Sequence, residues 1–535
     1  MHVVLVSPRN PRSFWTLDFA LRTLAKPCAM PNLALPTLAA LTPAPHSVRL
    51  VDENVEQVDF DVHADLVGIT GYIVHKQRML ELIAGFKARG KRVVVGGAYA
   101  TLCPEDFEGK ADVLFVGEAE DTWARFLADY ERGTWDPVYR APELPDVSSR
   151  PVPRFDLLHA DKYRTMLMQF SRGCPFDCEF CDIIVMYGRK PRTKSVATAM
   201  AEIEALHRLG TRSVFIVDDN FIGNRARAKD LLVALARWQK EHGYPMTFIT
   251  EASINLARDE RLLELMRAAN FRTVFIGIES PRPASLTETH KVQNAREDLV
   301  KATRKIQSYG LEVQAGMIVG FDADDAAIFR EHLEFLERAR IPVSMSGLLN
   351  AVPKTPLHQR LALEGRLLGQ TTGDQFVFTN ITPKGMSPKE LYSGYRQLLE
   401  ELYDHRNYLR RAGALIREVG EPAPAKVGRD FGVFFRFLWH CIVRADRARA
   451  RLSVSLLAIA LFNKPRRIGL AVSLAIWHLH LYEFTRSITP QLLELEKELD
   501  EVPDALRQSS ASLPTDFLVP LRRGPPRAAA GTSTT

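Results

Sequence analysis

The stretch from residue 171 to residue 181 reads Ser171-Arg-Gly-Cys174-Pro-Phe-Asp-Cys178-Glu-Phe-Cys181, and it directs the interpretation of the whole chain. Three thiols lie within eight residues, at the end of a predicted strand. A structural zinc site needs four protein ligands in a tetrahedron, and the other cysteines and the histidines are far away in sequence. Three thiolates suit an iron–sulfur cluster in which one iron has no protein ligand and can hold a substrate. Zinc binding and simple burial of the thiols are the less favoured interpretations.

Around this motif, the chain alternates between short strand-like runs and amphipathic helical stretches. We expect six strands, at residues 166–171, 213–217, 247–251, 273–278, 312–319 and 343–349. Six β/α units predict a partial barrel with its chemistry at the carboxyl ends of the strands. The cysteine motif follows the first of these strands.

The first 130 residues show a similar alternation. We expect strands at residues 2–6, 47–51, 66–70, 92–95 and 113–116, which predict an α/β domain with a doubly wound parallel sheet. Its ligand should lie at the carboxyl edge of that sheet. A Pro-rich stretch over residues 137–153 is interpreted as a linker.

The last third of the chain predicts a separate helical region, with helices at residues 386–417 and 488–501. Between residues 431 and 482, eight Lys or Arg residues stand against one acid in a mostly apolar segment. Such a segment suits helices lying in an anionic membrane interface, or a buried hairpin that caps the substrate. The predicted domains are residues 1–136, a linker at 137–160, the barrel at 161–356, the helical domain at 357–508, and a disordered tail at 509–535.

Composition narrows the class of protein. The 535 residues are 46% hydrophobic and 25% charged, which is typical of a globular chain, and a net charge of +6 gives no argument for nucleic acid. Six cysteines and no cleavable signal predict a reducing, cytoplasmic compartment. No uncharged run is long enough to span a bilayer, but contact with the inner face of a membrane remains open.

The Cys-x3-Cys-x2-Cys spacing resembles the signature of the radical S-adenosylmethionine superfamily. The resemblance implies that Cys174, Cys178 and Cys181 hold a [4Fe-4S] cluster whose open iron is chelated by S-adenosylmethionine, and that reductive cleavage gives a 5′-deoxyadenosyl radical. It also implies S-adenosylmethionine contacts along the barrel edge. These expected positions are Phe180, Asp218, Asp219, Asn220, Glu251, Ser253, Gly277, Glu279, Ser280, Gly316 and Gly320. It assigns no catalytic acid or base.

The sheet domain before the barrel resembles the cobalamin-binding domain of cobalamin-dependent members of this superfamily, over residues 1 to about 355. The expected cobalamin positions are Thr70, Gly71, Tyr72, Gly96, Gly97, Gly117 and Glu118. The Asp-x-His-x-x-Gly motif that supplies a cobalt ligand elsewhere is absent, so we expect no histidine from that motif on cobalt. His75 is interpreted as an ordinary residue that starts a helix. An ordinary Rossmann domain is disfavoured because no Gly-x-Gly-x-x-Gly follows the first strand.

The run from Gln169 to Cys174 and on through Cys181-Asp-Ile-Ile is similar to the branch that includes hopanoid methylases. We therefore expect a methyltransferase acting on an unactivated carbon, with a polycyclic isoprenoid lipid as substrate and a flavodoxin or ferredoxin as electron donor. An enzyme with the same cofactors but no methyl transfer, such as an oxidative cyclase, is the alternative. A non-enzymatic iron–sulfur redox sensor is less favoured, because no nucleic-acid-binding motif is found.

Overall fold

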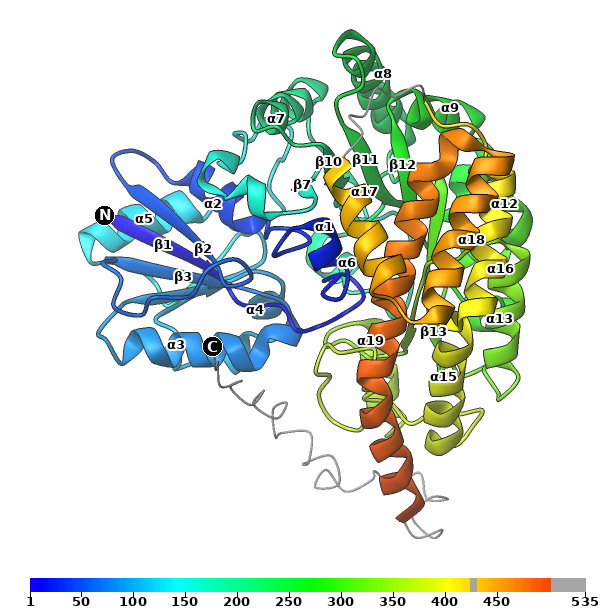
Figure 1. Cartoon of the computed structure of the whole chain (residues 1–535). Coiled ribbons are helices and arrows are strands. Elements are labelled where there is room, and N and C mark those ends of the chain that lie inside the picture. The colour runs from blue at the N-terminus through cyan, green and yellow to red at the C-terminus, as the bar shows by residue number, and fades with distance from the viewer. Residues whose placement is uncertain (424–430, 502–535) are drawn as a thin grey trace, which may run out of the picture.

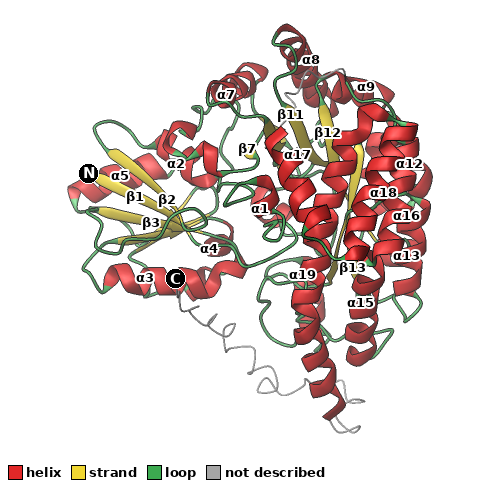
Figure 2. Cartoon of the chain, viewed as in Figure 1, coloured by secondary structure: helices red, strands yellow, loops and turns green. Residues whose placement is uncertain are grey.

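The computed structural model describes residues 1–423 and 431–501, so the tail predicted at 509–535 lies outside the described residues. Figures 1 and 2 show an α/β domain on one side, a second α/β unit on the other, and long helices packed against the second unit. Each α/β unit contains a six-stranded parallel sheet. The predicted fold class is confirmed.

The amino-terminal sheet has the strand order β2-β1-β3-β4-β5-β6. Its strands are β1 (His2–Ser7), β2 (Ser47–Asp52), β3 (Leu66–Thr70), β4 (Val93–Gly96), β5 (Val113–Val116) and β6 (Val138–Arg140). Helices cover both faces: α2 (Ala34–Leu41), α3 (Lys76–Lys87), α4 (Ala98–Leu102) and α5 (Trp123–Arg132). All of these strands are parallel, but the chain adds β2 on one side of β1 and β3 to β6 on the other. In doubly wound folds, a crevice opens where the strand order changes side in this way.

Strand β6 lies inside the segment that the sequence predicts as a linker. Tyr139 is buried and donates to a carboxylate oxygen of Asp129 at 2.8 Å, while its two neighbours in the strand are exposed. A three-residue edge strand between prolines is too short to produce a recognisable alternation. The chain therefore leaves the first sheet only after residue 140.

The second sheet has the order β14-β13-β12-β11-β10-β7 and curves into an open barrel. Its strands are β7 (Met166–Met168), β10 (Ser213–Ile216), β11 (Thr247–Ala252), β12 (Phe271–Glu279), β13 (Glu312–Val319) and β14 (Ser344–Leu348). Helices α7 (Val196–Arg208), α8 (Arg225–Glu241), α9 (Glu260–Ala268), α12 (Leu299–Ser308) and α13 (Ile328–Arg338) cover its outer face. The expected first strand is too long, because β8 (Ser171–Arg172) turns away and pairs with β9 (Arg192–Thr193).

Long helices close the open side of the barrel. They are α15 (Pro388–Tyr403), α16 (His405–Glu418), α17 (Phe431–Leu438), α18 (Arg447–Asn463) and α19 (Ile468–Glu501). The single helix expected at 386–417 is two helices, because the Asp404 carboxylate accepts hydrogen bonds from the backbone amides that begin α16. In the described part of the chain, no helix combines the length and apolarity needed to cross a bilayer.

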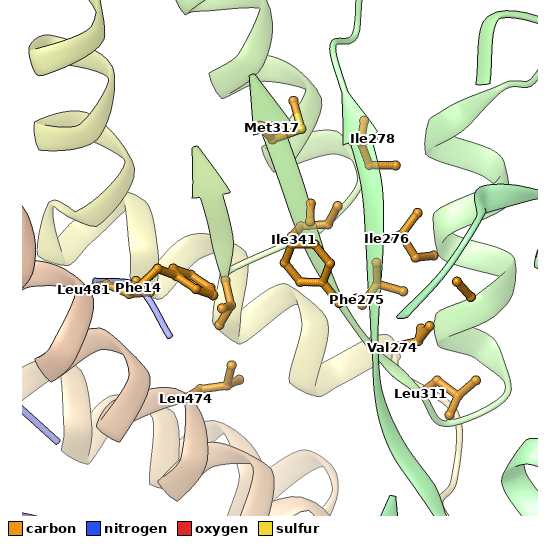
Figure 3. Close-up of a cluster of buried hydrophobic side chains, with 14 of the residues drawn as sticks. Phe14, Val274, Phe275, Ile276, Ile278, Leu311, Met317, Ile341, Leu474 and Leu481 are labelled. Atoms are coloured by element: carbon orange, nitrogen blue, oxygen red, sulfur yellow. The ribbon is translucent and has the colours of Figure 1, made fainter. Parts of the chain in front are cut away.

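The first long loop of the amino-terminal domain leaves that domain and enters the barrel unit. Phe14 stacks on Trp477 of α19, with ring centres 5.3 Å apart, and His480 lies within hydrogen-bond distance of the Phe14 carbonyl. Figure 3 shows the Phe14 ring beside Leu474 and Leu481 of α19, on the side that faces the strands. This loop thus packs into the hydrophobic core that the barrel and the helical region share, whereas the amino-terminal sheet has separate hydrophobic clusters.

Candidate active site

Two adjacent carboxylates hold the backbone that leads into the cysteine motif. Asp218 is buried and accepts hydrogen bonds of 2.7 Å from the Phe170 amide and the Ser171 hydroxyl. Asp219 accepts one of 2.8 Å from the Gly173 amide. Gly173 has a φ of +89°, and a Cβ there would lie 2.8 Å from a backbone oxygen, so no other residue fits. Both carboxylates, expected at S-adenosylmethionine, are engaged in shaping this turn.

The three thiols lie among hydrogen-bond donors and one buried cation. Asn220 and Gln293 each place an amide nitrogen 3.8 Å from a thiol sulfur, that of Cys174 and that of Cys178 respectively. Burial raises the pKa of the Cys174 thiol, and the Lys291 charge opposes that shift. Amide N–H groups and positive charge beside the sulfurs are the means by which proteins tune iron–sulfur clusters. The donor set fits a cluster held by three thiolates.

A single bound metal ion would need a tighter arrangement. Within the ranges 1–423 and 431–501, no three side chains of His, Cys, Asp or Glu lie close enough together to share one ion. All three motif cysteines are free thiols, as are Cys28, Cys103 and Cys441.

Three important polar residues escaped the sequence analysis, and all lie at or beside α11 (Val292–Ala295). Lys291 forms a buried ion pair with Glu279, with 2.7 Å between Nζ and Oε1. Gln293 reaches Cys178, and Asn294 donates to the Gly277 and Ile278 carbonyl oxygens at 2.9 and 3.0 Å. These residues are more than 100 positions from the cysteine motif, and no local pattern distinguishes them.

Several of the expected S-adenosylmethionine positions meet at the carboxyl edge of the barrel. Asn220 donates to the Ser253 hydroxyl at 3.2 Å, which joins the ends of β10 and β11. Glu251 lines a cavity, and burial raises its pKa to about 8, with nearby Asp219 and Glu279 adding to the shift. Phe180 lies 5.8 Å from the Lys291 ammonium, measured to the ring centre.

Others of the expected positions serve the backbone. A Cβ on Gly277 would lie 2.3 Å from a Glu279 carboxylate oxygen and 3.1 Å from the Lys291 ammonium. Ser280 is fully buried and accepts a hydrogen bond from the Arg282 amide. Gly316 lies against the Phe275 ring, and Gly320, with a φ of +104°, donates to Asp324. These contacts account for the small residues through packing and turn geometry.

A cavity of about 900 Å3 lies between the two α/β units. All seven expected cobalamin positions line it: Thr70, Gly71, Tyr72, Gly96, Gly97, Gly117 and Glu118. The barrel edge contributes Asp219, Glu251 and Tyr187. Gly97 has a φ of +95°, and a Cβ there would lie 2.2 Å from the Thr70 hydroxyl oxygen. At these glycines the backbone carries no side chain at the edge where a large planar cofactor would approach it, which fits cobalamin.

His75 lines this cavity, but both of its ring nitrogens are already engaged. Its Nδ1 accepts from the Tyr72 amide at 3.0 Å, and its Nε2 lies 2.9 Å from the Asn10 side-chain oxygen. Burial lowers the pKa of His75 to about 4, so it stays neutral at physiological pH. The side chain orders the loop after β3, as expected for a residue that starts a helix.

Glu118 joins the two α/β units. Its side chain is only 4% exposed and forms ion pairs with Arg172 and Arg192, which lie on the antiparallel β8–β9 pair beside the cysteine motif. Glu120 pairs with the same Arg172. Glu118 thus lines the cavity while both of its carboxylate oxygens accept hydrogen bonds from arginines.

The sheet domain, the partial barrel and the three thiols define an enzyme of the radical S-adenosylmethionine type. A model of the radical SAM superfamily matches residues 168–336, and a domain of unknown function, DUF4070, matches residues 355–493. The chain is 42% identical to an uncharacterized methyltransferase of Synechocystis, over 79% of this chain and 80% of that protein. It is 38% identical to the hopanoid C-2 methylase of Rhodopseudomonas palustris, over 68% and 71% of the two chains.

Two solved structures share the fold. The cobalamin-dependent radical enzyme OxsB covers 94% of this chain with a TM-score of 0.58, over 81% of its own length, at 16% identity. The radical S-adenosylmethionine methyltransferase TsrM from Kitasatospora setae covers 89% with a TM-score of 0.55, over 99% of its own length, also at 16% identity. This chain belongs to a family of radical S-adenosylmethionine methyltransferases that includes the hopanoid methylases. Its cofactors are a [4Fe-4S] cluster and S-adenosylmethionine. The OxsB structure contains cobalamin and S-adenosylmethionine, and the TsrM structure contains cobalamin and a [4Fe-4S] cluster.

Proposed function

We propose that this enzyme adds a methyl group to an unactivated carbon of a polycyclic isoprenoid lipid, of the kind that hopanoid methylases modify. The single observation that carries the proposal is the 38% identity to the hopanoid C-2 methylase over 71% of that protein. When bound, the three cofactors supply a carbon radical that removes substrate hydrogen and a methyl group that replaces it.

The chain's own residues hold and shield that chemistry. Cys174, Cys178 and Cys181 hold the cluster, and the amides of Asn220 and Gln293 stabilise charge on two of the sulfurs. The loop glycines after β3, β4 and β5 let cobalamin approach the sheet edge. Below the reaction chamber, Trp15 stacks against Phe215 and lies 5.1 Å from Phe275, measured between ring centres. This aromatic neck keeps bulk water from reaching the radical through the barrel.

We divide the chain by the same roles. Residues 1–140, which include β6, carry cobalamin, residues 161–356 carry the cluster and S-adenosylmethionine, and the helical region from residue 357 covers the substrate. A flavodoxin or ferredoxin is the proposed electron donor.

The helical region offers a surface for a membrane. Phe435, Trp439 and Phe462 are 65%, 49% and 84% exposed, which is unusual for side chains of this size. Exposed arginines at 444, 447 and 451 lie on the same helices or between them. Aromatic side chains next to arginines suit an anionic lipid interface, where each cation gains up to about 1 kcal/mol.

Product analysis tests the reaction. The reconstituted enzyme, supplied with reductant and a hopanoid, should give a product heavier by one methylene unit, about 14 Da, together with 5′-deoxyadenosine and S-adenosylhomocysteine. Formation of 5′-deoxyadenosine with an oxidised product of unchanged carbon count would overturn methyl transfer and favour the cyclase alternative.

A charge-reversal triple variant tests the membrane surface. Changing Arg444, Arg447 and Arg451 to glutamate should abolish sedimentation with anionic liposomes at low salt while leaving iron and cobalamin content unchanged. Three exposed arginines on α8 and α9 (Arg225, Arg227 and Arg261), reversed in the same way, form the matched control. Equal loss of liposome sedimentation in both variants would show that the effect comes from the overall charge of the protein. Arg449 and Arg467 are left intact, because the first pairs with Glu483 and the second is buried.

A further inference from the structure

A second, larger cavity lies at the opposite end of the barrel from the cysteine motif. Its volume is about 1660 Å3, above the usual range for small-molecule sites, and it is lined by the amino-terminal ends of β10 to β13 and by α17 and α19. Phe434, Val472 and Ile476 contribute apolar surface from the two helices. Four residues line both cavities: Trp15, Ala29, Met30 and Phe215. This second cavity, called the lower cavity, therefore adjoins the cavity between the two α/β units at the aromatic neck.

The lower cavity is strongly basic. Six arginines line it, against two glutamates, Glu312 and Glu421. The arginines are Arg164, Arg212, Arg267, Arg272, Arg466 and Arg467. Glu312 offsets only part of this charge, because burial raises its pKa to about 7. An apolar cavity with an excess of positive charge suits a ligand that has both an anionic group and a hydrocarbon part.

Arg467 is a second, independent observation that points to an anionic ligand. The residue is 6% exposed, and its Nε and Nη2 atoms are buried with no hydrogen-bond acceptor among the described residues. Burial lowers its pKa, and the neighbouring Arg272 and Arg267 lower it further, while Glu421 and Glu312 act in the opposite direction. A guanidinium does not lose its proton in a protein, and burying a cation with two unsatisfied N–H groups is costly. An anion bound in the cavity removes that cost.

Arg272 faces the same space from β12. It is half-buried and donates a hydrogen bond of 3.3 Å to the Ala423 carbonyl oxygen. Two guanidinium groups from different elements therefore line one cavity and lie close enough to repel each other, and such pairs of arginines bind phosphate or carboxylate groups.

We propose that the lower cavity binds an amphipathic anion, with its phosphate or carboxylate head on Arg467 and Arg272 and its hydrocarbon chain between α17, α19 and the barrel strands, pointing toward the Trp15 neck. This site is independent of the methyl transfer. It involves neither the thiols nor the cavity between the two α/β units. Its ligand is recognised by head charge and chain length together.

Binding to the full-length reconstituted enzyme tests the site, with alkyl phosphates below their critical micelle concentrations as probes. Decyl phosphate should bind at one saturable site by titration calorimetry. Decanol and inorganic phosphate should each bind at least about 10-fold more weakly, since each lacks one half of the interaction. In the hexyl, octyl and decyl series, affinity should rise by about fourfold per methylene group. Phosphate binding as tightly as decyl phosphate would show a simple anion site and overturn the proposal, as would decanol binding equally well.

Two variants on separate elements are used, so that a folding defect in one of them does not decide the test. Arg467→Met and Arg272→Met should each weaken decyl phosphate binding by about 10- to 100-fold and leave decanol binding unchanged. The control is Arg447→Met, at the exposed first residue of α18. Unchanged binding of decyl phosphate in both cavity variants refutes the assignment of the head group. Iron and cobalamin content, measured in every variant, separates loss of this site from loss of the cofactor sites.

Discussion

Changing Glu118 to glutamine should weaken the junction between the two α/β units. The carboxylate is 4% exposed, and Arg172 and Arg192, its partners, are 16% exposed. Removing its charge leaves Arg192 without its carboxylate partner, although Arg192 still donates to the Pro145 carbonyl oxygen at 2.7 Å. Breaking a buried ion pair on one side costs about 3–5 kcal/mol. We expect about 3 kcal/mol here, because Glu120 still pairs with Arg172.

Urea unfolding followed by circular dichroism, together with limited proteolysis of the 137–160 segment, measures this effect. The variant should unfold at lower urea and be cleaved faster. The matched control is Asp121→Asn, three residues away, whose carboxylate pairs with Arg150 and is 49% exposed. That pair should contribute less than about 1 kcal/mol.

A double-mutant cycle separates pairing from other roles. Arg192→Gln alone should also destabilise, and Glu118→Gln combined with Arg192→Gln should cost less than the sum of the two changes, since each single variant leaves an unpaired partner. If Glu118→Gln keeps the native urea midpoint and proteolysis rate but loses cobalamin, the side chain serves the cofactor and the reasoning from the ion pairs is wrong.

Three further predictions concern the cofactor sites. Alanine at Cys174, Cys178 or Cys181 should abolish cluster iron, while alanine at the buried Cys441 should leave it intact; equal loss at Cys441 would show that the ligand set is wrong. Electron paramagnetic resonance of the cobalt(II) state should show no superhyperfine splitting from a protein imidazole, because both nitrogens of His75 are engaged; such splitting would contradict this. In protein freed of its cofactors, Glu251 stays protonated in the folded state up to about pH 8, whereas in the unfolded chain it ionises near its ordinary value of 4.5. The unfolded state therefore binds fewer protons between these values, so stability should fall as pH rises from 4.5 to 8, and Glu251→Gln should flatten that fall in a series of urea midpoints.

Much of this protein is determined by local sequence. The apolar runs of the eleven predicted strands lie within or beside strands of the two sheets, because a parallel strand buried on both faces must be almost wholly apolar. The three thiols needed only their spacing to indicate a cluster. The glycines at 96, 97 and 117 were placed at the cavity edge by strand order alone, because the carboxyl ends of parallel strands meet at one edge.

Tertiary structure alone decided which charges meet. Glu118 was expected at the ligand edge and lines the cavity there, but its arginine partners, more than 50 residues away, could not be predicted from the sequence. Lys291 and Gln293 reach the thiols from a four-residue helix that has no sequence signature. The basic segment at 431–482 contains both exposed arginines and the buried Arg467, and sequence periodicity did not separate them. The cause is the same in each case. The sequence pattern of a strand or helix indicates which face of that element a residue occupies. It does not indicate the partner of the residue, because a distant part of the chain supplies that partner.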